Sequence, residues 1–332
     1  MKKIFILIMG LSILLSGCGT GVFAKPIPTA TITTTVTPPP PTNTATVTLT
    51  PSITPTRFAT ASPIPTTTRV HLGPGTVNVP IILYHWIAVS PINSQYYVRP
   101  DKFDEEMKLL HDWGYTTITA ELLIKAITEG ADLPPRPILI TFDDGHLNNY
   151  TTAFPIMYKY GFTGTLYIIA NYMGTDQYMN ADQIKDMAAA GWEVGSHTIS
   201  HLDLTALEPD RQRREVVDSR TLLESKLGVP VRTIAYPFGI SNPGVIDYAH
   251  FAGYIGGMSL GFTDDQGVSN LYTLQRRDIK GTYDVKQFAA FLPWQGDPIY
   301  LPTDTPTPTT RPTRTPIPTY TWIPPTPKTP SP

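Results

Sequence analysis

Residues 138–150 read ILITFDDGHLNNY, and an apolar segment of strand length ends here in two adjacent carboxylates. Phe142 closes the apolar segment, Asp143 and Asp144 follow it, and Gly145 comes next. Neighbouring carboxylates repel each other at neutral pH, so the pair needs an explanation. Taken alone, an Asp pair before a glycine is also typical of a helix N-cap and turn. The surrounding sequence has to decide between a turn and a reactive site.

Apolar runs of strand length alternate with segments of helical period on both sides of this stretch. The expected strands are residues 79–85, 115–120, 136–142, 164–170, 192–196, 231–237, 254–259 and 271–277. The expected helices are residues 101–114, 120–130, 148–161 with an interruption at Pro155, 180–191, 208–228, 242–252 and 284–292. Apolar strands alternating with helices predict a parallel α/β fold, and seven or eight such units favour a distorted (β/α) barrel. An open doubly wound sheet is the alternative, but no Gly-rich phosphate-binding turn follows the first strand.

The composition predicts a single folded domain at residues 76–301. The chain has 332 residues, with 25 Lys and Arg against 27 Asp and Glu, a balance that does not favour nucleic acid as a partner. Residues 25–70 and 302–332 are dominated by Pro and Thr. Such segments bury too little apolar surface to fold, so we expect a disordered linker and a disordered tail at 302–332.

The N-terminus is a targeting segment. Two lysines precede an apolar run at residues 4–15 that is too short to span a bilayer, and LSGC follows. This pattern resembles a bacterial lipoprotein signal, with residues 1–17 removed, Cys18 lipidated and residues 18–75 as the anchored linker. A plain secretory signal is the alternative. We therefore expect an exported protein, held by its lipid at the outer face of the cytoplasmic membrane or in the cell envelope, with no other contact with a membrane.

Polar side chains gather at the carboxyl ends of the expected strands, where βα barrels build their active sites. They are His85, Asp143, Asp144, His197, His201, the YPFG segment at 236–239 and Arg276. His197 and His201 are four residues apart in GSHTISH, so one helical turn would turn both rings to the same side, close enough to share a metal ion. One Asp beside two His is the ligand number of a catalytic zinc site. The second Asp then stays free as a base, which explains the adjacent pair.

TFDDG, SHTISH and YPFG, in this order, resemble the motifs of the NodB-homology polysaccharide deacetylases, carbohydrate esterase family four, over roughly residues 79–293. The resemblance implies a distorted (β/α) barrel that hydrolyses N-acetyl or O-acetyl groups on a polysaccharide. It implies Asp143 as the general base. It also implies one divalent metal ion, with zinc expected, held by Asp144, His197 and His201.

Two positions depart from the family pattern. The third motif usually begins with Arg, which would steady the base, and here that residue is Ala235. No His follows His250, although the family usually places its general acid near the C-terminus. In the branch that deacetylates biofilm poly-N-acetylglucosamine the motifs are rearranged, and ILYHWI and LQRRDI resemble its elements. This resemblance implies His85 as the acid and Arg276 as the partner of Asp143.

The remaining candidates surround the expected acetyl pocket. Tyr236 and Phe238 are expected to wall it, with core packing as the alternative, and the Phe238 backbone N–H is expected to stabilise the oxyanion. His146 adjoins the first motif and is expected near the substrate.

The predicted function is metal-dependent removal of acetyl groups, N-acetyl foremost, from a cell-envelope or extracellular polysaccharide that contains N-acetylglucosamine, by a monomer. A catalytically impaired glycan-binding module is the first alternative, and the loss of Arg at position 235 supports it. A different metallohydrolase, such as a peptidase or phosphoesterase, is the second. The absence of a basic cluster near the motifs disfavours phosphate substrates.

Overall fold

The computed structural model describes residues 69–296. The expected signal peptide at 1–17, Cys18, most of the 18–75 linker and the 302–332 tail lie outside these residues. Within residues 69–296, no helix has the length and apolar character that a membrane crossing requires.

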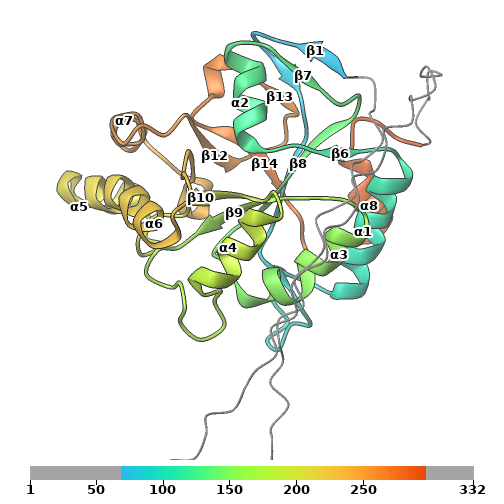
Figure 1. Cartoon of the computed structure of the whole chain (residues 1–332), viewed down its shortest axis with the longest axis horizontal. Helices are drawn as coiled ribbons and strands as arrows, with labels where there is room; N and C mark the ends of the chain where they lie inside the picture. Colours follow the sequence, from blue (N-terminus) through green and yellow to red (C-terminus); the bar gives the residue numbers. More distant parts are fainter. Residues whose placement is uncertain (1–68, 297–332) are drawn as a thin grey trace, which may run out of the picture. The chain divides into compact units, whose positions relative to one another are not determined.

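Seven parallel strands of the described chain close into a barrel (Figure 1). In order around the ring they are β3 (Ile81–Tyr84), β8 (Pro137–Phe142), β9 (Thr165–Ile168), β10 (Glu193–Ser196), β11 (Thr233–Ala235), β12 (Gly256–Leu260) and β14 (Leu274–Asp278). Each pairs in parallel with the next, and β14 returns to pair with β3. The ring is uneven, because β10 and β11 share only the pair Ser196 and Ile234. The predicted distorted (β/α) barrel is confirmed.

The expected helices form around this ring, with two differences in detail. Their bounds are α1 (Pro100–Asp112), α2 (Ala120–Thr128), α3 (Phe154–Lys159), α4 (Ala181–Ala189), α5 (Pro209–Arg213), α6 (Ser219–Leu227), α7 (Pro243–Phe251) and α8 (Val285–Ala290). Pro155 does not interrupt its helix, because a π-helical turn, η1 (Asn149–Ala153), leads into α3 and Pro155 lies in the first turn of α3, where proline is tolerated. The single helix expected at 208–228 is α5 and α6 joined by a second π-helical turn, η3 (Arg214–Asp218).

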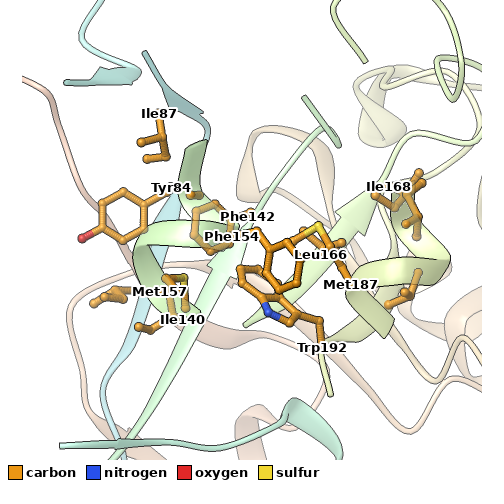
Figure 2. Close-up of a cluster of buried hydrophobic side chains, with 14 of the residues drawn as sticks. Tyr84, Ile87, Ile140, Phe142, Phe154, Met157, Leu166, Ile168, Met187 and Trp192 are labelled. Carbon is orange, nitrogen blue, oxygen red and sulfur yellow. The ribbon is translucent and has the colours of Figure 1, made fainter. Parts of the chain in front are cut away.

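Side chains along each strand alternate between two cores. Ile138, Ile140 and Phe142 of β8 point outward and pack against the helices, whereas Leu139 belongs to a second cluster inside the barrel. Figure 2 shows the outward cluster, where the Trp192 ring lies 5.4 Å from that of Phe142. Packing of this kind fixes the strands, and therefore the residues at their ends.

Helix α2 closes the end of the barrel at which the strands begin. The α2 side chains Leu123, Ile124 and Ile127 join the interior cluster. A Cβ on Gly256, the first residue of β12, would come within 2.7 Å of the Ile124 Cδ1 atom and 3.0 Å of the Leu271 carbonyl oxygen, so a larger residue would require Ile124 to shift. With apolar side chains filling this end, the polar side chains lie at the carboxyl ends of the strands.

Short strand pairs extend the barrel, and one of them corrects a predicted boundary. They are β1 (Val70–Leu72) with β7 (Ala131–Leu133), β2 (Val77–Asn78) with β13 (Asp265–Gln266), and β4 (Trp86–Ile87) with β5 (Tyr97–Val98). Strand β1 thus lies within residues 70–75, which were expected to belong to the linker. The Gly- and Pro-rich composition after this strand is typical of a linker, so the sequence did not predict the strand. Its pairing partner lies some sixty residues away, and His71 contacts Asp132 across the pair at 2.9 Å. The strand expected at 115–120 is also shorter, with β6 (Thr116–Thr117) pairing at the start of β8.

Candidate active site

A cleft of about 400 Å³ opens where the barrel strands end. Seven of the expected site residues line it, namely His85, Asp143, Asp144, His197, His201, Phe238 and Arg276. They come from the ends of five different strands or the loops that follow them. Two expected residues, Tyr236 and His146, do not line the cleft.

Asp144, His197 and His201 converge on one point. Asp144 Oδ1 lies 3.6 Å from His197 Nε2 and 3.5 Å from His201 Nε2, and the three atoms all lie within 4.8 Å of one another. Asp144 Oδ1 is buried and has no hydrogen-bond partner among the described residues. A buried carboxylate oxygen is costly unless something compensates it. One carboxylate and two imidazoles suit zinc and related divalent ions, so these residues fit a metal ion.

His197 is oriented for this task by the backbone. Its Nδ1 donates a hydrogen bond to the carbonyl oxygen of Ala235 at 2.8 Å, which leaves the lone pair of Nε2 directed at the carboxylates. Burial lowers the pKa of His197 below its ordinary value, against the opposing influence of Asp143 and Asp144, so the ring is neutral at neutral pH. Ala235 therefore contributes through its carbonyl group, although it lacks the expected Arg side chain.

His201 is presented by a loop, and the predicted helical turn is wrong. Thr198 and His201 have left-handed φ values of 65° and 55°, which a helix does not allow. The buried Glu215 of η3 braces the loop, because its Oε2 accepts hydrogen bonds from the backbone N–H groups of Ile199 and Ser200 at 3.0 and 2.8 Å. The two His rings still meet, with centroids 4.8 Å apart. The i and i+4 spacing therefore predicted correctly that the two rings meet, but a loop and not a helical turn brings them together.

Asp143 forms a buried, bidentate ion pair with Arg276. The two guanidinium NH groups donate to the two carboxylate oxygens at 2.6 and 2.8 Å, and both side chains are at least 97% buried. Burial by itself raises the pKa of Asp143, but the charge of Arg276 and of nearby histidines outweighs it, so the pKa lies below its ordinary value. Arg276 on β14 thus brings a guanidinium to Asp143 where Ala235 offers none.

On another wall of the cleft, His85 faces Asp278. His85 Nδ1 lies 3.8 Å from Asp278 Oδ1, and neither buried atom has a hydrogen-bond partner among the described residues. Lys280 Nζ donates to the other oxygen of Asp278 and lies 4.4 Å from the centre of the Tyr96 ring. A protonated His85 would be stabilised by Asp278. The sequence reasoning missed Asp278, yet a signal existed, since a residue two places after Arg276 on a strand faces the same side.

The family follows from sequence matches. The family model "Polysaccharide deacetylase" matches residues 130–256. YxkH of Bacillus subtilis (strain 168), which is named for the same family, is 33% identical over 218 residues, covering 64% of this chain and 76% of that protein. The chain belongs to the polysaccharide deacetylases.

Two further relatives of this deacetylase are informative. The structure of the Streptococcus pyogenes deacetylase PplD in complex with acetate superposes with a TM-score of 0.61 at 29% identity, covering 65% of this chain and 98% of that one. The poly-beta-1,6-N-acetyl-D-glucosamine N-deacetylase of Staphylococcus aureus (strain MRSA252) is 28% identical over 181 residues, or 50% of this chain. The match spans only 61% of the length of that enzyme.

Tyr236 and His146 lie elsewhere than expected in this deacetylase. Ala235 faces the barrel interior, so the next residue, Tyr236, faces the outward core, where it is fully buried. Burial also raises the pKa of Tyr236. His146 contacts Asp144, because its Nε2 donates to Asp144 Oδ2 at 3.0 Å. Neither side chain lines the cleft that a substrate would enter.

Phe238 lies at the rim of the cleft in the deacetylase, as expected. Its side chain is 58% exposed, and its ring centroid lies 4.9 Å from that of His201. The backbone of Phe238 has a left-handed φ of 61° within the turn η4 (Pro237–Gly239). His250, the last histidine of the chain, lies on α7 against Tyr272 and does not line the cleft.

Proposed function

We propose that this chain hydrolyses N-acetyl groups of a polysaccharide that contains N-acetylglucosamine, with one divalent metal ion held by Asp144, His197 and His201. The observation that carries the proposal is the buried Asp144 Oδ1, which has no hydrogen-bond partner within residues 69–296 and faces two imidazole nitrogens beside the ionised Asp143. The match to an enzyme named as a poly-beta-1,6-N-acetyl-D-glucosamine N-deacetylase supports this substrate class. Zinc is the expected ion.

The reaction divides among the residues of the cleft. Asp144, His197 and His201 would hold a divalent ion, which when bound would polarise the acetyl carbonyl and make water more acidic. Asp143 accepts the proton of the attacking water, while the two-pronged contact with Arg276 holds its carboxylate in place and ionised. The Phe238 N–H donates to the acetyl oxygen as negative charge develops. His85, stabilised by Asp278, protonates the departing sugar nitrogen.

A glycan-binding module without turnover is the second candidate, since Ala235 removes the guanidinium that the family usually supplies. Arg276 weakens this alternative, because it gives Asp143 a buried guanidinium partner from another strand. The two candidates predict different fates for a bound polymer. The enzyme releases acetate and leaves free amines, whereas the module binds the polymer and leaves it unchanged.

The test is acetate release from oligomers of poly-β-1,6-N-acetylglucosamine and of chitin. We expect acetate and free amine to appear in equal amounts, to stop after treatment with a chelator and to return with added Zn²⁺. Binding of oligomer without acetate release, in protein shown to contain metal, would favour the module. Release that survives complete removal of metal would contradict the proposed role of the metal ion.

We also propose that the protein is exported and anchored through a lipid on Cys18. The support is the LSGC sequence after a short apolar run with two preceding lysines. An anchored enzyme on the outer side of the cytoplasmic membrane would meet cell-envelope and extracellular polysaccharides, which agrees with the proposed substrate class.

A further inference from the structure

We propose that His146 is a positioning residue that holds Asp144 in the orientation needed to bind the metal ion. This inference rests on the proposed metal site and adds a residue that contacts neither the ion nor the substrate. Its Nε2 donates to Asp144 Oδ2 at 3.0 Å. That bond occupies one carboxylate oxygen. The other, Oδ1, faces His197 and His201 and is free to bind the ion.

Asp144 needs an external partner to fix its side chain. Its φ of 71° lies in the left-handed region, which Asp tolerates better than most residues but adopts only when its surroundings enforce it. Gly145 follows with a φ of 84°, so the chain turns sharply at this point. The Asp144 carboxylate would otherwise be free to rotate and offer either oxygen, or both, to the ion. The bond from His146 selects one.

His146 is itself held rigidly, which a positioning residue requires. Its side chain is nearly fully buried. The ring of Trp86 stacks on it with centroids 3.5 Å apart and an interplanar angle of 23°, and the Tyr178 ring lies 5.0 Å away. The backbone of His146 also forms an antiparallel bridge with Tyr178. Trp86 in turn stacks on Tyr97 at 4.9 Å. This aromatic packing fixes the direction in which the Nε2–H points.

The same contacts allow a simpler explanation, that His146 only fills the core between Trp86 and Tyr178. Three variants separate the alternatives. His146→Phe keeps an aromatic ring for the stack and removes the N–H. His146→Gln and His146→Met have similar length and volume, but only Gln can donate a hydrogen bond from about the position of Nε2. If packing alone matters, Gln and Met should behave alike, and Phe should resemble the wild type.

The experiment measures the dissociation constant for Zn²⁺ in the full chain, by competition with a chromophoric chelator. Loss of an outer hydrogen-bond partner of a metal ligand typically weakens metal binding by about 10- to 100-fold. We expect a loss of that size for His146→Phe and His146→Met, and near wild-type affinity for His146→Gln. In an Asp144→Ala background, His146→Phe should cause no further loss, because its effect passes through Asp144.

Several outcomes would overturn the inference. Wild-type affinity in both the Phe and Met variants would do so, as would equal affinity of the Gln and Met variants, or a further loss in the Asp144→Ala background. Thermal unfolding of the metal-free variants identifies any that do not fold. If the Phe variant does not fold, the comparison of the Gln and Met variants decides the question. Zn²⁺ binding needs no polysaccharide, so a wild type that binds Zn²⁺ but releases no acetate would refute the proposed function and leave this test intact.

Discussion

At the scale of single residues, unusual backbone angles gather around the cleft. Asp144, Thr198, His201 and Phe238 all have positive φ without being glycine. Such conformations cost on the order of 1–3 kcal/mol each and persist where the surroundings enforce them. Here Glu215 braces the His201 loop and His146 holds Asp144. The strained backbone thus directs side chains toward the cleft, whereas a regular helix or strand would direct them elsewhere.

Asp143→Asn should separate the base from the metal ligands. The amide cannot accept the proton of water, so kcat should fall by about two to four orders of magnitude. Zn²⁺ content should stay near that of the wild type, because the ligand atoms belong to other residues. Some stability should also be lost, since Arg276 remains buried without a charged partner. Acetate release, metal analysis and thermal unfolding check the three expectations, and an Asp143→Asn variant with most of its activity would exclude Asp143 as the base.

His85→Ala and His250→Ala should differ in their dependence on the leaving group. A sugar amine needs a proton to depart, whereas the phenolate of an aryl acetate hardly does. His85 lines the cleft and His250 does not, so His85→Ala should lose far more activity on an N-acetyl sugar than on an aryl acetate. His250→Ala, on the outer helix α7, serves as the matched control and should change neither rate. Metal content should be normal in both, and the opposite pattern would assign the acid to His250.

At the scale of elements, the alternation of strands and helices was predictable because it depends on local sequence patterns. Apolar runs such as residues 136–142 have strand length, and helices such as α4 carry their own caps. The errors arose where distant residues decide the structure. Strand β1 depends on β7, and the loop before His201 depends on Glu215, which lies on a later element. No local periodicity reports such partners.

Helix α1 and strand β3 are joined by a buried contact that should make stability depend on pH. Tyr84 donates a hydrogen bond from its hydroxyl to Glu106 Oε2 at 2.7 Å, and burial raises the pKa of Glu106 from 4.5 to about 8. The folded state then binds more protons than the unfolded state between these two values. This contribution to the free energy of unfolding is therefore full below pH 4.5 and declines as pH rises toward 8.

Glu106→Gln should remove that contribution to the pH dependence. The amide can still pair with Tyr84 but carries no charge, so the variant should be more stable than the wild type near pH 8. The advantage should shrink as pH falls toward 5. One unit of pKa corresponds to about 1.4 kcal/mol, so the effect should be measurable by urea unfolding at several pH values. Glu193, whose pKa burial raises to about 7, stays in both proteins and contributes a slope of the same sign. Parallel curves for the two proteins would contradict the assignment to Glu106.

At the scale of the whole molecule, the barrel unites residues that the sequence keeps far apart. Asp143 and Arg276 are separated by 133 positions, yet they meet across the interior because their strands share one carboxyl edge. The sequence motifs identified these two residues, and the predicted fold class placed both at the carboxyl edge of the barrel. The distance between them could not be predicted, because it depends on the uneven pairing of the strands and on the packing of side chains inside the ring.

Cys18→Ser tests the proposed anchoring of the whole molecule. Without the thiol no lipid can be attached, so the variant should move from the membrane fraction to the soluble or secreted fraction. Among the described residues, those that line the cleft lie between Leu83 and Asp278, far along the chain from Cys18. Rates on soluble oligomers should therefore equal those of the wild type, whereas deacetylation of polymer at the cell surface should fall. Unchanged fractionation would leave Cys18 without the proposed role, and a matching loss of rate on soluble oligomers would mean that the N-terminal segment supports the enzyme itself.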